Sequence, residues 1–226
     1  MSVVGNGTFL LAEETAPLVS WNAAGWAVAG ALLGGTLAAA AIPRLLAQRD
    51  PFPRWRSVSG CAAASGIAVG VLAARFDGIE LVAFGFLACV GVVLAAIDLL
   101  ERRLPGRLVV PSYGVLGGLL AFEAAGTERW GNILTAFAAA FVVVLAYLLV
   151  ALASRGGLGS GDVKFGGLLS MAMGWQGWST VVTGTAVAWL GAAAVLIALR
   201  CLGRRPDAVP MGPFLLFGAL VALVFG

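Results

Sequence analysis

Eight long runs of apolar residues divide the chain, and short stretches richer in polar residues separate them. The runs fall at residues 22–42, 57–74, 79–100, 108–125, 133–154, 163–177, 179–199 and 209–226. Most of them approach the length of a helix that crosses a bilayer, which needs roughly 20 residues. The pattern therefore predicts an all-α, polytopic membrane bundle of about eight transmembrane helices over residues 21–226. A short extracytoplasmic arm, residues 1–20, precedes it.

The tightest part of this pattern is residues 163–199, which must supply two helices and the turn between them. If this segment were one long helix, the three arginines that follow it would move to the opposite side of the membrane. They are Arg200, Arg204 and Arg205. The distribution of basic residues therefore favours two separate helices.

The composition agrees with a protein whose solvent is largely lipid. Hydrophobic residues make up 61% of the chain and charged residues 11%. Soluble chains contain about 45–50% apolar and about 25% charged residues. The chain therefore has too few charges to cover the surface of a water-soluble globule of this length, and we exclude that class.

Basic residues alternate along the chain in a way that orients it. Of the 14 lysines and arginines, all but Arg75 and Arg129 fall in one set of alternate connections. Cytoplasmic loops carry the excess of basic residues, so this set is predicted to face the cytoplasm of a plasma membrane and both termini to lie outside. Trp21, Trp130, Trp175 and Trp178 then fall near the outer interface and Trp55 near the inner one, as an aromatic belt would. The basic residues stand singly between apolar runs, which argues against a nucleic-acid partner.

Several classes of chemistry are excluded by what the chain lacks. It contains no histidine, which rules out serine-histidine and cysteine-histidine catalysis and HExxH zinc sites. Its three cysteines lie far apart in the sequence at Cys61, Cys89 and Cys201, and they form no CxxC pair. We therefore expect no metal and no cofactor. Catalysis, if present, depends on carboxylates, lysine, arginine or hydroxyl groups.

Three of the 11 acidic residues fall where an apolar run places them at membrane depth: Asp98, Glu123 and Asp162. An ionisable group at that depth costs several kcal/mol unless it is paired or faces water, so each is a functional candidate. Glu123 is near the outer end of its helix and can reach the interface. Asp98 ends a helix that runs inward, and Asp162 opens one that runs outward. The topology therefore places both at the cytoplasmic face, where they can meet.

The local sequence predicts different protonation states for these two acids. Asp162 follows Gly159-Ser160-Gly161 at an N-cap position, where the helix dipole favours a carboxylate. Asp98 stands at a helix C-terminus among apolar residues, which favours the protonated form. One charged and one neutral carboxyl group can activate water for attack on a peptide bond. The structural alternative is that Asp162 only caps its helix and Asp98 pairs with Arg102.

Three segments in this order resemble the type IV prepilin peptidases, a family of GxGD membrane aspartyl proteases. The first is Asp98 followed by Leu104-Pro105, and the second is the GxGD-x-K segment from Gly159 to Lys164. The third is Pro210-Met211-Gly212-Pro213-Phe214, at the start of the last apolar run. The resemblance implies that Asp98 and Asp162 are the two catalytic acids. The residues that it implies as motif support are Gly159, Gly161, Lys164, Pro210, Gly212 and Pro213.

The resemblance also implies a substrate and a reaction. The enzyme would cut the short basic leader from pilin-like precursor proteins at the cytoplasmic face, just before their hydrophobic stretch. Many bacterial members carry paired CxxC motifs in an insert after the first span and also methylate the new N-terminus. Here that connection extends only from Pro43 to Arg56 and contains no cysteine. We therefore expect a short form that has peptidase activity only.

Three other functions fit parts of the sequence. A presenilin-like protease also uses GxGD, but it would carry a PAL-type segment where this chain has Pro210 to Phe214. A serine-lysine hydrolase would use Ser160 and Lys164, which are four residues apart on one helical face. A transporter would use Asp98 and Asp162 as a proton or cation site near a glycine-rich break. Against transport, both acids lie at one face and the chain shows no inverted repeat.

Recognition of a basic leader must be local, because the predicted cytoplasmic loops are themselves basic. Glu101 stands three residues after Asp98, about one helical turn away. We hypothesise that Glu101 receives a basic leader residue near the cut, while the apolar part of the substrate packs along the glycine-lined start of the helix that follows Asp162. The alternative is that Glu101 is a solvated acid paired with a neighbouring arginine.

Overall fold

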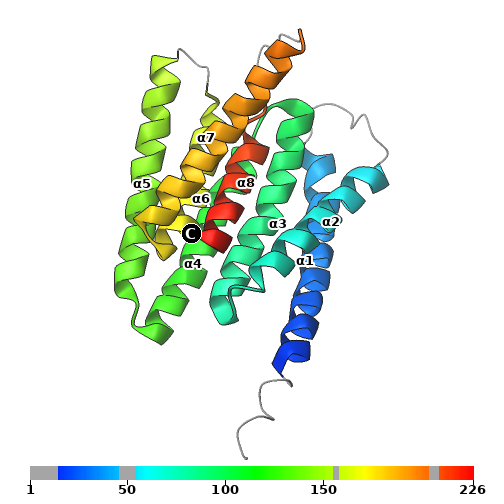
Figure 1. The fold of residues 1–226 in the computed structure, drawn as a ribbon, viewed down its shortest axis with the longest axis vertical. Coiled ribbons are helices and arrows are strands. Elements are labelled where there is room, and N and C mark those ends of the chain that lie inside the picture. Colours follow the sequence, from blue (N-terminus) through cyan, green and yellow to red (C-terminus); the bar gives the residue numbers. More distant parts are fainter. Residues whose placement is uncertain (1–14, 46–53, 155–157, 204–208) are drawn as a thin grey trace, which may run out of the picture.

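The computed structural model describes residues 15–45, 54–154, 158–203 and 209–226, and within these ranges it is an all-helical bundle (Figure 1). The described residues form eight helices: α1 (Thr15–Leu45), α2 (Arg54–Leu72), α3 (Gly78–Glu101), α4 (Gly106–Thr127), α5 (Trp130–Ala153), α6 (Ser160–Gln176), α7 (Trp178–Cys201) and α8 (Gly212–Phe225). Each predicted apolar run corresponds to one of these helices. The predicted fold class is therefore confirmed.

Six of these helices are long and apolar enough to cross a membrane, namely α1 to α5 and α7. The other two are shorter than the prediction of eight full spans implied. Helix α6 has 17 residues and α8 has 14. At 1.5 Å per residue they rise about 26 Å and about 21 Å, less than the roughly 30 Å of a hydrocarbon core. The chain is thus a multi-pass membrane protein with two short helices among its spans.

Residues 163–199 form two helices, as the charges indicated. Helix α6 ends at Gln176 and α7 begins at Trp178, so only Gly177 separates them. Gly177 has a φ of 134°, in a region of backbone conformation that favours glycine. The break between α6 and α7 is therefore set by one residue whose lack of a Cβ permits the reversal.

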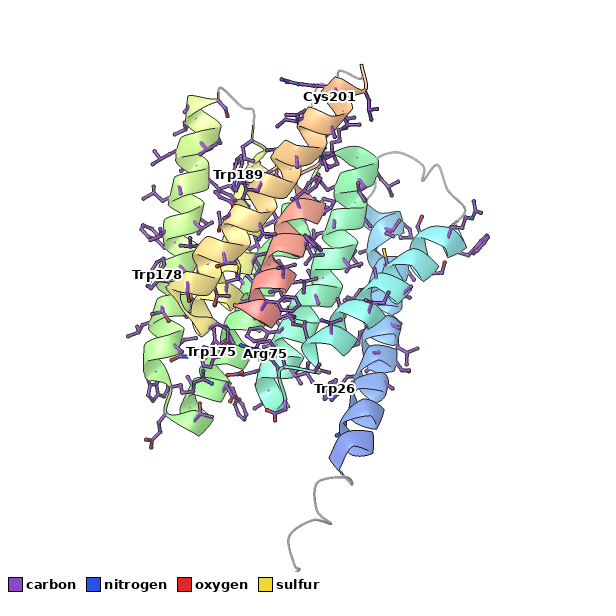
Figure 2. The ribbon with its side chains drawn as sticks, viewed as in Figure 1. Trp26, Arg75, Trp175, Trp178, Trp189 and Cys201 are labelled. Atoms are coloured by element: carbon purple, nitrogen blue, oxygen red, sulfur yellow. The ribbon has the colours of Figure 1, made fainter. Side chains whose placement is uncertain are left out.

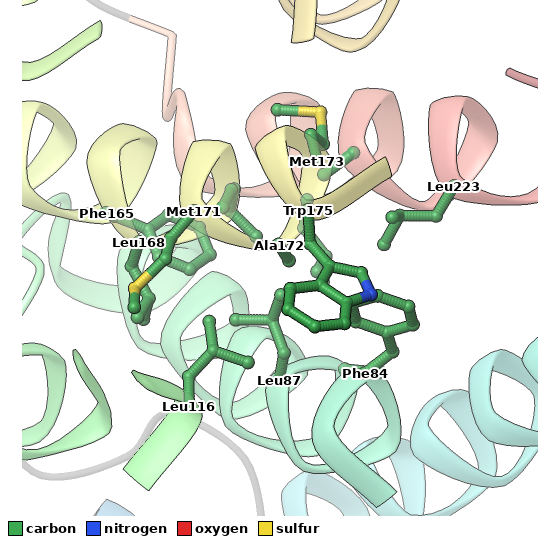
Figure 3. Packing of buried hydrophobic residues seen from close by; sticks show 14 of the residues in the cluster. Phe84, Leu87, Leu116, Phe165, Leu168, Met171, Ala172, Met173, Trp175 and Leu223 are labelled. Atoms are coloured by element: carbon green, nitrogen blue, oxygen red, sulfur yellow. The ribbon is translucent and has the colours of Figure 1, made fainter. Parts of the chain in front are cut away.

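The short helix α6 lies inside the bundle. Helix α6 contacts α4, α5, α7 and α8, and α3 contacts α1, α2, α4 and α8. Figure 3 shows the core between them, in which Trp175 of α6 lies against Phe84 of α3. Phe84, Phe165 and Trp175 are completely buried. Because neighbouring helices surround α6, its sequence need not supply a long lipid-facing surface.

The tryptophan prediction is correct for only part of the outer set. Trp130 and Trp178 of the outer set and Trp55 of the inner set are exposed, as residues of an aromatic belt would be, whereas Trp175 is completely buried. The side chain of Trp21 lies outside the described part of the chain. Figure 2 shows Trp175 and Trp178 toward the lower end of the bundle and Cys201 at its upper end. Trp175 therefore belongs to the core instead of the interface, where its Nε1 donates a hydrogen bond to Glu80 of α3.

The predicted arm at residues 1–20 is only partly described. Helix α1 already begins at Thr15, within that arm, and residues 1–14 lie outside the described part of the chain. Most of the predicted connection between the first two helices, residues 46–53, also lies outside it. The same holds for residues 155–157 and 204–208, which include Arg155, Arg204 and Arg205.

Candidate active site

Asp98 lies in the last turn of α3 and is buried, with 4% of its surface exposed. Its Oδ2 atom accepts a hydrogen bond of 2.8 Å from the backbone N–H of Gly212, the first residue of α8. A Cβ atom added at Gly212 would lie 3.0 Å from Asp98 Oδ2 and 3.3 Å from its Cγ. Helix α8 can therefore bring its N-terminus onto the Asp98 carboxyl group because residue 212 has no side chain.

Asp162 lies in the first turn of α6 and not at the N-cap, where the sequence placed it. The N-cap residue is Gly159, and its backbone N–H donates a 3.2 Å hydrogen bond to Asp162 Oδ2. The other carboxyl oxygen, Oδ1, is buried without a hydrogen-bond partner among the described residues. Asp162 therefore caps the helix with one oxygen and keeps the second available.

The end of α3 that carries Asp98 and the start of α6 that carries Asp162 lie side by side. A tight contact between two turns holds them there. A Cβ atom added at Gly161 would lie 2.6 Å from Leu104 Cβ and 2.9 Å from the Leu104 carbonyl oxygen. Leu104 follows the end of α3, where Arg102 has a left-handed φ of 53° and reverses the chain. The segment before α6 thus packs directly on the turn after α3, and this contact joins the two acids.

Lys164 follows Asp162 by two residues and points toward the same turn. Its side chain is exposed, and its Nζ atom lies 3.7 Å from the position that a Cβ atom on Gly106 would occupy. The Tyr113 hydroxyl group donates a 2.7 Å hydrogen bond to the Lys164 carbonyl oxygen. Helix α4 therefore supports the start of α6 from the side, while the ammonium group lies over the connection between α3 and α4.

The proline-rich segment before α8 supports Asp98 through Gly212. Pro213 lies within the first turn of α8. Backbone N–H groups in a first turn have no acceptor within the helix, so a proline costs no hydrogen bond there. Pro210 and Pro213 are both half-buried, and Gly212 between them is buried. The two prolines restrict the backbone on either side of the Gly212 amide that binds Asp98.

Residues 85–225 match the type IV leader peptidase family. The chain belongs to this family. The match includes Asp98, Asp162 and the segment from Pro210 to Phe214, and it leaves out α1 and α2. The three segments on which the resemblance was based therefore all lie inside the matched region.

Curated relatives agree with the family match. The chain is 32% identical over 174 residues to prepilin leader peptidase/N-methyltransferase from two strains of Burkholderia pseudomallei, 1026b and K96243, which covers 73% of the chain and 53% of each relative. It is 28% identical over 139 residues to the protein of that name from Aeromonas hydrophila, which covers 60% of the chain and 46% of the relative. The chain thus spans about half the length of the curated relatives it matches. No solved structure matches the chain.

Within this member of the leader peptidase family, two aromatic residues near the acids had no signal in the sequence. Tyr147 of α5 packs on Gly166 of α6, and a Cβ atom added at Gly166 would lie 2.4 Å from its ring. Trp189 of α7 donates a 3.0 Å hydrogen bond from Nε1 to the Tyr147 hydroxyl oxygen. Both lie inside apolar runs without any recognisable motif, and only the packing of three helices brings them together.

The glycines at the start of α6 do not form an open surface. Gly161 contacts Leu104, Gly166 contacts Tyr147, and Gly167 contacts Val144. The expectation that the apolar part of a substrate packs along them is therefore wrong. The side chains of α4 and α5 and of the turn after α3 already occupy that space.

A second polar cluster lies at the opposite end of the bundle. Glu80, in the first turn of α3, has only 15% of its side chain exposed and forms an ion pair with Arg129. Trp175 donates a 2.9 Å hydrogen bond from Nε1 to Glu80 Oε1, and the Arg129 guanidinium group lies 5.2 Å from the centre of the Trp175 ring. The cluster joins α3, α5 and α6, and we interpret it as structural.

The serine-lysine alternative lacks the environment that it needs. A lysine acts as a base when burial removes its charge. Ser160 and Lys164 are both exposed. No group of three or more acidic or cysteine side chains that could hold a metal ion occurs among the described residues. The chemistry that the described geometry offers is that of two adjacent carboxyl groups.

Proposed function

We propose that the chain is an aspartic endopeptidase that removes the short basic leader from pilin-like precursor proteins. The observation that carries this proposal is the meeting of the helix ends that hold Asp98 and Asp162, through the contact between Gly161 and Leu104. The family match and the names of the relatives support the same reaction. The geometry also fits the substrate, because the acids lie at the end of apolar helices, where a leader joins an apolar segment.

In the proposed mechanism the two carboxyl groups share one proton. The ionised group takes a proton from a water molecule, whose oxygen attacks the carbonyl carbon of the scissile peptide. The protonated group gives its proton to the carbonyl oxygen. The tetrahedral intermediate then collapses as the C–N bond breaks. The leaving amine takes the proton that the first carboxyl group received from water, and the second carboxyl group regains its proton from the hydroxyl group as the C=O bond reforms. The N–H groups of Gly212 and Gly159 hold one oxygen of each carboxyl group, and Asp162 Oδ1 is available to the water.

The proposed reaction takes place at the cytoplasmic face. The helix ends near the two acids also carry most of the described basic residues, including Arg56, Arg102, Arg107 and Arg200. Arg75 and Arg129 lie at the opposite end, after α2 and before α5. An excess of basic residues marks cytoplasmic loops, and this supports an orientation with the acids inside and both termini outside.

The orientation predicts which positions an impermeant thiol reagent can reach. A cysteine placed at Thr127, an exposed residue at the end of α4, is expected to react when the reagent is added outside intact cells. A cysteine at Arg103, an exposed residue after α3, is expected to react only after the membrane is opened. Both are introduced into a chain whose own three cysteines have been replaced, because Cys201 is exposed. The opposite labelling pattern would contradict the orientation.

We propose that Glu101 binds a basic residue of the leader. Glu101 is the last residue of α3, one turn beyond Asp98, and is half-buried. An exposed ion pair contributes only about 0–1 kcal/mol. The Glu101→Gln variant is therefore expected to raise KM by about fivefold at most and to leave kcat unaltered. Kinetics on leaders with and without the basic residue measure this effect. If the Glu101→Gln variant raises KM equally for both leaders, or for neither, Glu101 does not bind the basic residue.

We further propose that this chain is a short form without methyltransferase activity. The connection between α1 and α2 contains no cysteine, and so it lacks the paired CxxC motifs expected of the longer form. Cleaved product is then expected to carry an unmethylated amino terminus when analysed by mass spectrometry. A methylated terminus, made by the purified chain from an added methyl donor, would refute the short-form proposal without affecting the peptidase proposal.

The experiment that tests the function uses the full chain in lipid vesicles. The substrate is a precursor with a basic leader, a glycine and an apolar span, and leader release is followed by the mass of the product. Cleavage before the apolar span is the expected result. If the precursor stays intact while the same vesicles leak protons under a pH gradient, the proposal is overturned in favour of the transporter alternative.

A further inference from the structure

A cavity of about 650 Å³ lies between α2, α3 and α8 and is lined almost entirely by apolar side chains. Its lining includes Ile67 and Val71 of α2, Ala96 and Leu99 of α3, and Phe217 and Leu220 of α8. We refer to it as the α2–α3–α8 groove. Figure 1 shows α8 beside α3, with α2 on the other side of α3.

The groove opens sideways from the bundle. Ile67 is 69% exposed, Leu99 61% and Phe217 61%. These are large apolar side chains on three different helices, and they face the region that lipid occupies in a membrane. Helix α8 is part of the family match, whereas α2 lies outside it. One wall of the groove therefore comes from α2, a helix outside the region that matches the family.

The upper end of the groove reaches the candidate active site. Leu99 directly follows Asp98 in the chain, and Pro213 directly follows Gly212, whose N–H binds Asp98. The groove therefore begins one residue away from both partners of that hydrogen bond. From Pro213 to Phe225 its lining follows α8 for about 18 Å. In this direction the groove runs away from the acids and along the apolar length of the helix.

Two other surfaces of the described residues do not offer this path. The glycine face of α6 is filled by Leu104, Tyr147 and Val144. A second hollow lies between α1 and α2, but its lining includes no neighbour of Asp98 or Asp162. Among the surfaces that the structure describes, the α2–α3–α8 groove joins an apolar path to the candidate acids.

We infer that the α2–α3–α8 groove binds the apolar segment of the pilin-like precursor as a helix, directly beyond the scissile bond. The inference depends on the proposed function, in which the cut lies just before that segment. A substrate cut at Asp98 must continue into the membrane from that point, and the groove begins there and runs in that direction. Small residues in its lining, such as Ala64 and Ala96, let another helix approach closely, and close packing is what favours helix association in lipid.

The charge at the mouth of the groove sets the direction in which a precursor enters. Arg56 lies at the start of α2, lines the groove at its cytoplasmic end and is exposed. Its positive charge disfavours a basic leader inside the groove, whereas an uncharged apolar segment meets no such repulsion. The precursor therefore binds with its apolar segment in the groove and its leader outside.

Photo-crosslinking in membranes tests the inference directly. A photoreactive phenylalanine analogue is placed at Ile67 or Phe217 in the groove, in the inactive Asp162→Asn background so that the precursor stays intact. Matched positions outside the groove are Phe141 of α5 and Leu190 of α7, which are 69% and 70% exposed. The expected result is crosslinking to the precursor's apolar segment from the two groove positions and from neither control position. Crosslinking of the groove positions only to lipid, or only to a second copy of the chain, would overturn the inference.

A filling substitution provides a kinetic test with the active enzyme. Ala64→Trp places a large side chain in the groove, and Ala194→Trp places the same side chain on an exposed position of α7. Ala64→Trp is expected to reduce kcat/KM for the full precursor about tenfold more than for a short leader peptide without the apolar segment, mainly through KM. Equal losses for both substrates, or equal effects of both variants, would refute the groove assignment. Failure of the unsubstituted enzyme to cut any precursor would instead refute the proposed function.

Discussion

The Asp98→Asn and Asp162→Asn variants are each expected to lose leader cleavage by at least about 10³-fold, because an amide can neither take nor give the catalytic proton. The two carboxyl groups act as a unit, so the double variant should be no worse than either single variant. Single-turnover cleavage of a precursor in membranes measures the loss. The amount of full-length protein in the membrane, measured in parallel, separates this loss from a failure to fold.

Ser160→Ala is the matched control for these variants. Ser160 lies two residues before Asp162 in the same helical turn, and its side chain is exposed. The variant is expected to cleave as well as the unsubstituted enzyme. Substantial turnover by Asp162→Asn would refute the two-carboxylate mechanism. An inactive but folded Ser160→Ala would support the serine-lysine alternative.

The Gly161→Ala variant is expected to reduce kcat by about 10²-fold, since a misplacement of about 1 Å at a reacting group costs a factor of that size. Gly161 lies in helical backbone, so alanine is compatible with its conformation. The loss comes from packing, because the new methyl group would lie 2.9 Å from the Leu104 carbonyl oxygen. The contact that joins the turn after α3 to the start of α6 must then open, and the two acids move apart.

Gly114→Ala is the matched control for Gly161→Ala. Gly114 lies in α4, and a Cβ atom added there meets nothing within 4 Å. Its cleavage rate is expected to equal that of the unsubstituted enzyme, which shows that a glycine-to-alanine change in a helix is tolerated. Thermal unfolding in detergent checks that both variants remain folded. If Gly161→Ala cleaves at the unsubstituted rate, the turn contact does not position the acids.

The helices could be predicted from the sequence because each depends on local information. A run of apolar residues of about membrane length has to form a helix, since lipid offers no partner for backbone N–H and C=O groups. The short connections then force successive helices to run in opposite directions. For this reason the sequence also placed Asp98 at the end of α3 and Asp162 at the start of α6, at the same end of the bundle.

The surroundings of the acids depend on contacts between segments far apart in the chain. In the sequence, the C-terminal position of Asp98 in its helix and its apolar neighbours predicted a neutral carboxyl group. The structure adds the N-terminus of α8, whose Gly212 N–H binds that carboxyl group. It also moves Asp162 from the N-cap into the first turn, where Gly159 holds one oxygen. The prediction of one charged and one neutral acid from the local sequence alone is therefore incomplete.

The sequence by itself determined the fold class, the number and order of the helices, and the pair of acids at one end, because hydrophobic length and loop length are local properties. Tertiary structure alone decided what covers each helix. It buried Trp175 against Phe84 and Glu80, filled the glycine face of α6 with Tyr147, and left a groove between α2, α3 and α8. In an apolar chain nearly every helix face looks alike in the sequence, and only the packing of side-chain shapes distinguishes a buried face from an open one.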